Sequence, residues 1–334
     1  MCTHARLYLV LPETLVMVRK MNRYVIDTDG GVDDAVALLV ALRLSDVRVE
    51  VITTVAGNVG IKQSTANTLR VLEQLRLTGV TNLPLVAQGE SMPLRVPQET
   101  ATHVHGDDGL GNVAHMFKYD IEMLSGDSAV NVLVDLACTY GEGLTLVTLG
   151  PLTNVARAVL KAPDVMRGVG GVVMMGGCFD RKGNTTPVSE FNVYVDPHAV
   201  QVVLNSGMPI TIVPLDVTEQ VRLMRTDLDL FSGAPFGPFL EAVTESYMRF
   251  HEVSCGFYGC YVHDALAVAV AFDDGLVEKA VAHVAVEAES RVTRGAMVAE
   301  FNEAGQTRCP VNAQVCINID ESCFHEWMGN RLLL

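Results

Sequence analysis

Basic residues are scarce in the sequence, and long uninterrupted apolar runs are missing. Its 334 residues include 24 Lys and Arg against 39 Asp and Glu, which leaves a net charge of -15. Because nucleic acids and anionic membrane surfaces are bound through basic patches, we expect neither as a partner. No apolar run reaches the roughly 20 residues of a membrane-spanning helix without charged or turn residues. A small uncharged ligand, or one held through a metal, fits this composition better.

Paired cysteines and tryptophan are rare as well. The eight cysteines are scattered, and no two of them form a Cys-x-x-Cys pair. They are typical of reduced thiols, most of them small buried apolar residues, and they predict a cytoplasmic protein. The only tryptophan is Trp327, near the C-terminus.

The start of the chain differs from the remainder. Its apolar stretch is interrupted by Pro12 and Glu13, and no small-residue cleavage site follows a basic leader. We therefore expect residues 1–22 to form an N-terminal extension. Residues 23–334 contain no internal repeat and no low-complexity linker, so they are expected to form a single domain.

Strand-like and helix-like segments alternate along the chain. The pattern predicts strands at 24–28, 47–55, 83–87, 144–149, 171–175 and 209–213, with helices at 33–44, 61–77, 128–140 and 197–205 and one after Pro151. This alternation predicts an α/β fold with an open, mostly parallel, Rossmann-like sheet that is covered by helices. Ligands bind such sheets at the carboxyl ends of the strands, where we expect the active site. Residues 215–262 are the least regular, and we expect them to be partly helical and partly mobile.

Four carboxylates fall on one predicted turn between the first strand and the first helix. They are Asp27, Asp29, Asp33 and Asp34, within Asp-Thr-Asp-Gly-Gly-Val-Asp-Asp. Like charges this close are relieved by a cation or a shared proton, and a hard divalent metal accepts oxygen ligands of this kind. Capping of the helix explains one or two of the acids only. The turn therefore predicts a metal or catalytic site.

Three later motifs carry polar groups that suit such a site. The loop His103-Val104-His105-Gly106-Asp107-Asp108 is either a structural turn or part of the site. Leu149-Gly150-Pro151 is a strand-to-helix turn with exposed carbonyls, which calcium accepts as ligands. His263-Asp264 opens an apolar helix, where the pair acts either as a cap or as site residues.

A polar loop adds groups that suit hydroxyl ligands. It presents Asn184, Glu190 and Asn192, and amides donate and accept hydrogen bonds while a carboxylate accepts them. Taken alone, these residues would be an ordinary polar loop.

In this order, the motifs resemble the inosine-uridine preferring nucleoside hydrolase family over about residues 23–270. They are the Asp-x-Asp-x-x-x-Asp-Asp turn, Ala-Gly-Asn, His-Gly-Asp-Asp-Gly-Leu-Gly, Gly-Pro-Leu-Thr-Asn, Met-Gly-Gly, Glu-Phe-Asn and His-Asp-Ala-Leu-Ala. The resemblance implies hydrolysis of the N-glycosidic bond of ribonucleosides to free base and ribose, in nucleoside salvage, with a bound Ca²⁺. It also implies a homodimer or homotetramer.

The resemblance assigns roles by motif position. The implied calcium ligands are Asp29, Asp34, the main-chain carbonyl of Leu149 and Asp264. The implied substrate-binding residues are Asp33, Asn58, Asn184, Glu190 and Asn192. Asp29 is the implied base that takes a proton from metal-bound water, and a glycosidic bond breaks through an oxocarbenium-like state that carboxylates stabilise.

The leaving base needs a proton and a surface to stack on. His263 is the candidate acid, helped by His105 or a loop tyrosine. Purine-specific members stack tryptophans on the base, whereas the only tryptophan here, Trp327, lies near the C-terminus. Phe257, Tyr258 and Tyr261 are candidates for stacking instead, and core packing is an equally good account of any one of them. We therefore expect a member of the histidine-containing type with broader specificity.

Two other functions use part of the same pattern. A haloacid dehalogenase-type phosphohydrolase would use Asp27 as nucleophile together with Mg²⁺, but it has no role for Asp33-Asp34, Glu-Phe-Asn or His-Asp. A non-catalytic nucleoside- or ribose-binding protein would keep the site and lose turnover.

Overall fold

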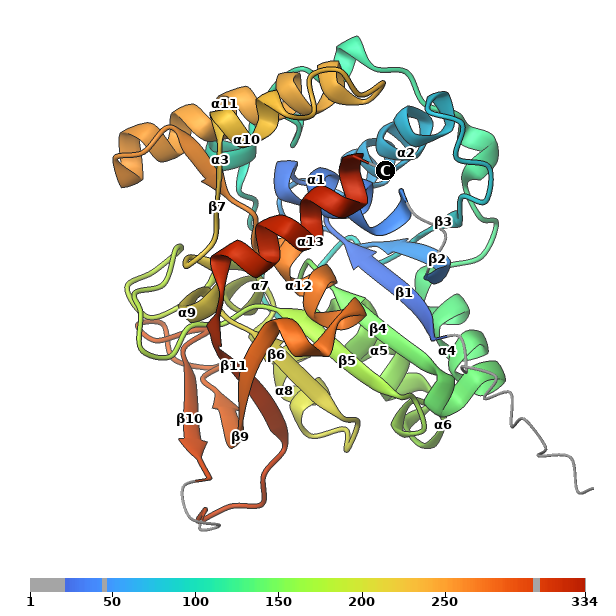
Figure 1. Ribbon diagram of the computed structural model, residues 1–334. Coiled ribbons are helices and arrows are strands. Elements are labelled where there is room, and N and C mark those ends of the chain that lie inside the picture. Colours follow the sequence, from blue (N-terminus) through green and yellow to red (C-terminus); the bar gives the residue numbers. More distant parts are fainter. Residues whose placement is uncertain (1–21, 44–46, 303–306, 334) are drawn as a thin grey trace, which may run out of the picture.

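A computed structural model describes residues 22–43, 47–302 and 307–333 of the chain (Figure 1). The predicted N-terminal extension lies outside the described residues apart from residue 22. Within the described ranges, no helix combines the length and the apolar character that crossing a membrane requires.

A nine-stranded sheet forms the centre of the molecule (Figure 1). Its strands are, in spatial order, β10 (Met297–Phe301), β9 (Val277–Val286), β11 (Ala313–Ile319), β6 (Ile210–Val213), β5 (Gly171–Met175), β4 (Leu144–Thr148), β1 (Arg23–Thr28), β2 (Arg48–Thr54) and β3 (Leu85–Gln88). Neighbours from β11 to β3 pair in parallel, and β9 pairs antiparallel with β11 and β10. The predicted open, mostly parallel α/β sheet is confirmed, and the antiparallel edge after residue 276 is an addition to it.

Helices cover both faces of the sheet. One apolar cluster includes residues of α1 (Val32–Leu42), α2 (Ile61–Leu77), α12 (His263–Phe272) and α13 (Glu321–Leu333). The other includes residues of α4 (Ala129–Tyr140), α5 (Thr153–Lys161), α6 (Pro163–Arg167) and α8 (Pro197–Leu204). Within β1, Ile26 joins the first cluster and Val25 the second, because successive strand side chains point to opposite faces.

The helix α1 is buried along its whole length. All of its residues from Val32 to Leu42 are buried, including Asp33 and Asp34 in the first turn. A helix that is apolar all round belongs in the interior of a large domain. Two acids are therefore carried into the core by a helix that has no solvent-facing side.

Residues 215–262 are more regular than their composition suggests. They form α9 (Leu215–Thr218), β7 (Arg222–Met224), α10 (Arg225–Asp229), α11 (Gly237–Cys255) and β8 (Gly259–Tyr261). The expectation that this segment is partly helical is confirmed, and α11 alone has 19 residues. In Figure 1 this helix lies beside α3 (Thr102–His105) at the top of the molecule, and the two elements are in contact.

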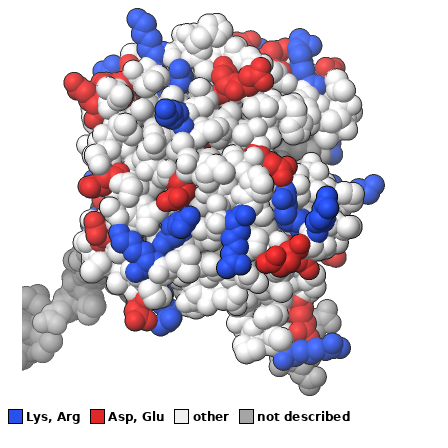
Figure 2. Space-filling model, turned by 180° about the vertical axis from the view of Figure 1, so that it is seen from behind, with Lys and Arg blue, Asp and Glu red and all other residues white. Residues whose placement is uncertain are grey.

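The shorter elements complete the description. They are α7 (Phe191–Val195) and the 3-10 helices η1 (Ala114–Met116), η2 (Ile121–Met123), η3 (Gly141–Gly143) and η4 (Asp274–Leu276). Charges of both signs lie interspersed on the face seen in Figure 2, with no continuous basic surface on that face.

Candidate active site

The candidate site lies where β1, β2 and β4 end. Asp29 follows β1, Asn58 lies in the turn after β2, and Leu149 follows β4, while His263 and Asp264 open α12. These strands are neighbours in a parallel sheet, so their carboxyl ends meet at one edge. Segments that are far apart in the sequence thereby bring their polar groups together.

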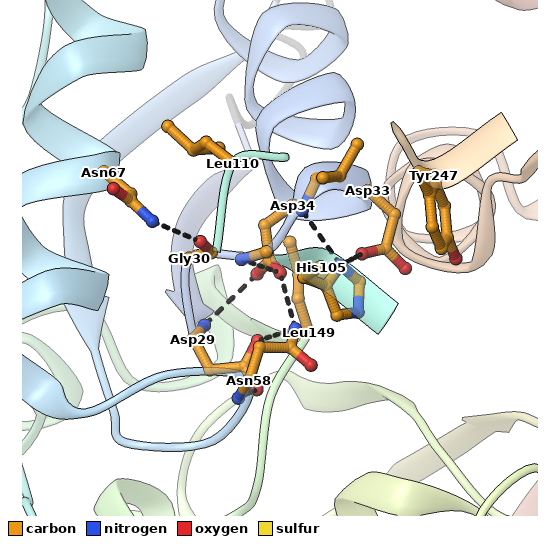
Figure 3. A network of polar contacts seen from close by, with 12 residues as sticks. Asp29, Gly30, Asp33, Asp34, Asn58, Asn67, His105, Leu110, Leu149 and Tyr247 are labelled. Carbon is orange, nitrogen blue, oxygen red and sulfur yellow. Dashed lines mark hydrogen bonds and ion pairs between the residues drawn. The ribbon is translucent and has the colours of Figure 1, made fainter. Parts of the chain in front are cut away.

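Asp34 is the most heavily hydrogen-bonded acid of the turn (Figure 3). One of its oxygens, Oδ1, accepts from the Thr28 hydroxyl and from the backbone nitrogen of Asp29 at 3.1 Å; the other, Oδ2, accepts from the nitrogen of Gly31 at 2.8 Å. Gly30 in the same turn has a φ of +74°, and a Cβ there would come within 2.7 Å of the Ser64 backbone. The turn around this carboxylate therefore requires glycine at position 30.

Asp29 is oriented by Asn58. The backbone nitrogen of Asn58 donates to Asp29 Oδ2 at 2.7 Å, and its side-chain nitrogen donates to Asp29 Oδ1 at 2.9 Å. The same side-chain nitrogen lies 3.3 Å from Asp34 Oδ2. Asn58 therefore connects two acids of the turn, and its role in binding substrate stays a prediction.

Three buried acids are arranged so that they could hold a cation. One ligand atom each from Asp33, Asp34 and Asp264 lies within 4.8 Å of the others. Within the described part of the chain, Asp33 Oδ1 is buried with no hydrogen-bond partner. Asp29 does not belong to this closest group, although its charge acts on Asp264.

Burial and mutual repulsion oppose ionisation of these acids. Burial, followed by the charge of Asp34, raises the pKa of Asp33 to about 8 and the pKa of Asp29 well above its usual range. Burial and then the charge of Asp33 do the same to the pKa of Asp264. Without a cation the cluster favours proton uptake, and a divalent cation would remove this penalty.

The predicted carbonyl ligand and the polar loop meet beside this cluster. The side-chain nitrogen of Asn192 donates to the carbonyl oxygen of Leu149 at 2.7 Å. Glu190 is buried and accepts hydrogen bonds from the backbone nitrogens of Asn192, Val193 and Gly177, so it also caps α7. Burial raises the pKa of Glu190 to about 7. Asn184 is exposed and accepts from the Phe191 nitrogen at 2.9 Å.

His105 connects the acids to a group of aromatic rings. Its Nδ1 accepts from the Val32 nitrogen at 3.2 Å and lies 3.8 Å from Asp33 Oδ1. Its ring stacks on Tyr247 at 5.2 Å (Figure 3). Burial lowers the pKa of His105 to about 4, so the ring is neutral near pH 7, with its proton on Nε2.

Tyr247 and His251 were not among the residues predicted from the sequence. Both lie on α11, within the segment that the sequence pattern left without defined elements. Tyr247 packs edge-on against His251 at 4.5 Å, and His251 packs against Tyr261 at 5.2 Å. Tyr261 in turn lies 5.6 Å from His263. The helical spacing of four residues between Tyr247 and His251 was the available signal.

The other aromatic candidates lie differently. Phe257 packs against His251 at 5.6 Å and against Tyr261 at 5.1 Å, so it belongs to the ring group. The hydroxyl of Tyr258 donates to Glu245 at 2.6 Å, and Glu245 pairs with Arg249. These contacts do not join Tyr258 to the acid cluster.

His263 is held by Thr218 from α9. Its Nδ1 lies 2.7 Å from the Thr218 hydroxyl oxygen, and the side chain is buried. Burial, followed by the influence of His251 and His105, lowers the pKa of His263 to about 3. The imidazole is therefore neutral near pH 7 in the metal-free and ligand-free protein.

Comparisons with known proteins agree with this arrangement. The family model described as inosine-uridine preferring nucleoside hydrolase matches residues 24–326. The pyrimidine-specific ribonucleoside hydrolase RihA of Enterobacter sp. (strain 638) is 33% identical over 92% of this chain and 96% of its own. The inosine-uridine preferring nucleoside hydrolase of Crithidia fasciculata is 32% identical over 90% of this chain and 93% of its own. The purine-preferring ribonucleoside hydrolase of Gardnerella vaginalis superposes with a TM-score of 0.84 at 31% identity, covering 93% of this chain and 98% of that one.

The fold and the acid-lined strand ends are those of a nucleoside hydrolase. The chain belongs to the inosine-uridine preferring nucleoside hydrolase family. It is an enzyme that hydrolyses the N-glycosidic bond of ribonucleosides, and the predicted function is confirmed. The family match leaves the phosphohydrolase and the non-catalytic binder without support.

Proposed function

We propose that the enzyme uses one Ca²⁺, held by Asp29, Asp34, the Leu149 carbonyl and Asp264. The observation that carries the proposal is the buried group of Asp33, Asp34 and Asp264, whose ligand atoms lie within 4.8 Å of one another. The donors are all oxygen atoms, which is the set that calcium prefers. The raised pKa values of the proposed ligands Asp29 and Asp264 also fit a cation at this place.

Asp29 is the proposed general base. When bound, a divalent cation would lower the pKa of a coordinated water molecule. Two hydrogen bonds from Asn58 set the orientation of the Asp29 carboxylate, so its free lone pairs are directed before substrate binds. A base fixed in this way loses little orientational freedom during the proton transfer.

The sugar is held by Asp33, Asn184, Glu190 and Asn192 in this proposal. Asp33 Oδ1 is free to accept from a ribose hydroxyl, and burial strengthens such a bond. The nitrogen of Asn192 is committed to Leu149, which leaves its carbonyl oxygen for the sugar. Carboxylates around the ring also stabilise the positive charge of an oxocarbenium-like transition state.

His263 is proposed to stabilise the leaving base. When the Thr218 hydroxyl donates to Nδ1, the ring proton lies on Nε2, and a neutral imidazole donates a hydrogen bond from there. Tyr261 and Phe257 belong to the adjoining group of rings and suit stacking on a base. His105 offers a second donor through Nε2, and Tyr258 remains a predicted contact.

We propose that both purine and pyrimidine nucleosides are substrates. Histidine and tyrosine rings stack on either kind of base, and relatives named for either preference are about equally similar to this chain. A homodimer or homotetramer and a cytoplasmic location are proposed on the family resemblance and on the scattered cysteines.

A reducing-sugar assay on inosine and uridine tests the proposed base. Asp29→Asn should lower kcat by about 10²–10⁴-fold, the range typical of general base catalysis. Asp164→Asn is the matched control, since the side chain of Asp164 is 91% exposed. Full activity of Asp29→Asn would show that another group takes the proton.

A further inference from the structure

The short helix α9 ends in a buried hydroxyl group that is directed toward another element. The Thr218 side chain has no exposed surface, and its Oγ1 lies 2.7 Å from Nδ1 of His263, the first residue of α12. Threonine hydroxyls within helices commonly donate to the carbonyl oxygen four residues earlier, as those of Thr65 and Thr244 do here at 2.8 and 2.7 Å. The Thr218 hydroxyl makes no such bond and is directed to His263 instead.

The direction of this hydrogen bond determines the tautomer of His263. Among the described residues, the Thr218 hydroxyl makes a hydrogen bond to Nδ1 of His263 and to no other atom. A buried donor without an acceptor is unfavourable, and the hydroxyl hydrogen would lose its acceptor if Nδ1 carried the ring proton. The hydroxyl therefore donates to Nδ1, and the ring proton lies on Nε2.

Nε2 of His263 is available to a ligand. It makes no hydrogen bond with any residue that the structure describes. The buried side-chain atoms left without a partner in the described part of the chain do not include it, so it keeps some accessible surface. A base that departs from the site would therefore meet an N–H donor at this atom.

Asp216 anchors α9 to the loop that follows β5. Its carboxylate accepts from the backbone nitrogens of Phe179 and Asp180 at 2.9 and 2.7 Å. Asp216 and Thr218 belong to the same single turn of helix. Because a helix this short has little stability of its own, contacts with other elements keep Thr218 in place.

The same loop connects α9 to one of the proposed sugar ligands. The Leu215 nitrogen donates to the Gly177 carbonyl oxygen at 2.9 Å. The Gly177 nitrogen in turn donates to the carboxylate of Glu190 at 3.1 Å. Because sugar and base are joined in the substrate, a donor that is fixed relative to a sugar ligand is also oriented toward the leaving base.

We propose that Thr218 is a positioning residue for nucleoside hydrolysis, which holds His263 in the tautomer with its proton on Nε2. When the N-glycosidic bond breaks, its electron pair passes to the base, and the Nε2–H group stabilises the charge that develops there. The inference rests on the proposed role of His263. It adds the residue that determines which of the two ring nitrogens can donate.

Steady-state kinetics of Thr218→Val and Thr218→Ser test the role of the hydroxyl. Valine keeps the shape of threonine but leaves Nδ1 without a donor. The kcat for inosine and uridine should fall by about tenfold, the equivalent of one hydrogen bond. KM and the hydrolysis of p-nitrophenyl riboside should change little, because a phenolate departs without a donor. Thr218→Ser keeps the hydroxyl and should recover most of the lost rate.

Thr68→Val is the matched control. Thr68 is buried on α2, and its hydroxyl donates to the Ser64 carbonyl oxygen at 3.0 Å. The substitution removes a buried hydroxyl without touching His263, so the rates on both kinds of substrate should be preserved. Thermal melting should show that each variant is folded.

Nitrogen-15 NMR of the full-length protein with labelled histidine reads the tautomer directly. The unmodified protein should show His263 with its proton on Nε2, and the His263 signals are those that disappear in His263→Gln. Thr218→Val should move these signals toward the other tautomer. The measurement on the unmodified protein tests the inference even where a variant does not fold.

Three results would overturn the inference: a proton on Nδ1 of His263 in the unmodified protein, equal losses on nucleosides and p-nitrophenyl riboside in Thr218→Val, or unchanged rates in that variant. Failure of the proposed function gives a different result. If His263→Ala loses the same factor on both kinds of substrate, His263 is not the donor, and the role of Thr218 fails with it. If His263→Ala is selective and Thr218→Val is not, only the role of Thr218 fails.

Discussion

Calcium should stabilise the enzyme against unfolding, and the gain should increase between about pH 5 and about pH 8. Burial and Asp34 raise the pKa of Asp33 to about 8, and the pKa values of Asp29 and Asp264 are raised as well. The metal-free folded state therefore holds more protons than the unfolded state, from the ordinary aspartate pKa near 4 up to about 8. Its stability falls as the pH rises through this window. A bound cation requires ionised carboxylates, so its affinity rises over the same window.

The size of the effect follows from mass action. At a free calcium concentration about 1,000 times the dissociation constant, binding adds about 4 kcal/mol to the free energy of unfolding. For cooperative unfolding of 334 residues, the entropy of unfolding near the midpoint is about 0.7 kcal/mol per kelvin, so Tm should rise by roughly 6 °C. Near pH 5, protons compete for the same oxygens and the rise should be less than about half of this.

Scanning calorimetry with calcium or with chelator, at matched ionic strength, measures the two Tm values. Asp34→Asn should abolish the difference, because Asp34 is a proposed ligand and a member of the compact acid group. Asp164→Asn should preserve it, because Asp164 is exposed. An equal gain at both pH values, or a gain that survives in Asp34→Asn, would mean that calcium acts outside this cluster.

Three further predictions concern catalysis, support of the site and chain boundaries. His263→Ala should slow the hydrolysis of inosine and uridine by about 10²–10⁴-fold. Hydrolysis of p-nitrophenyl riboside should be almost unaffected, because a phenolate departs without a proton. Equal losses in initial rate on both kinds of substrate would assign His263 to sugar or metal binding. Asn154→Ala should lower the free energy of unfolding by about 2–4 kcal/mol in chemical denaturation, because Asn154 donates to Asp27 and Thr54 and accepts from Glu90. Asn131→Ala is its control, because Asn131 is exposed. An equal loss of unfolding free energy in the two variants would contradict this prediction. A chain of residues 23–334 should keep its ribose-releasing activity, since β1 begins at Arg23, and a large drop in Tm would show that residues 1–22 dock on the domain.

Much of the fold was predictable because its signals are local. The predicted strand at 144–149 corresponds to β4 (Leu144–Thr148), and the predicted helix at 61–77 corresponds to α2. Parallel pairing then brings the residues after β1, β2 and β4 together without any further information. This explains why Asp29, Asn58 and Leu149 could be grouped from the sequence, while their roles in catalysis stay predictions.

The helix α11 was harder to predict because strong turn signals precede it. Residues 232–238 read Ser-Gly-Ala-Pro-Phe-Gly-Pro, which is typical of a loop. The structure starts the helix at Gly237 and accommodates Pro238 in its first turn, where a missing N–H costs little. The contact of Tyr247 with His105 joins residues 142 positions apart, and no local pattern encodes it.

The acids of the first turn show where sequence patterns stop being informative. Asp27 was grouped with its neighbours by spacing, yet it accepts hydrogen bonds from Thr53 and Asn154. Burial raises its pKa to about 7, and its Oδ2 has no partner among the described residues. Asp29 instead accepts a hydrogen bond from Asn58, and Asp33 lies 3.8 Å from the Nδ1 of His105. The surroundings of each acid are therefore set by a partner on a different element. The spacing of the motif predicts that a site exists, and the topology of the sheet determines which partner each carboxylate has in it.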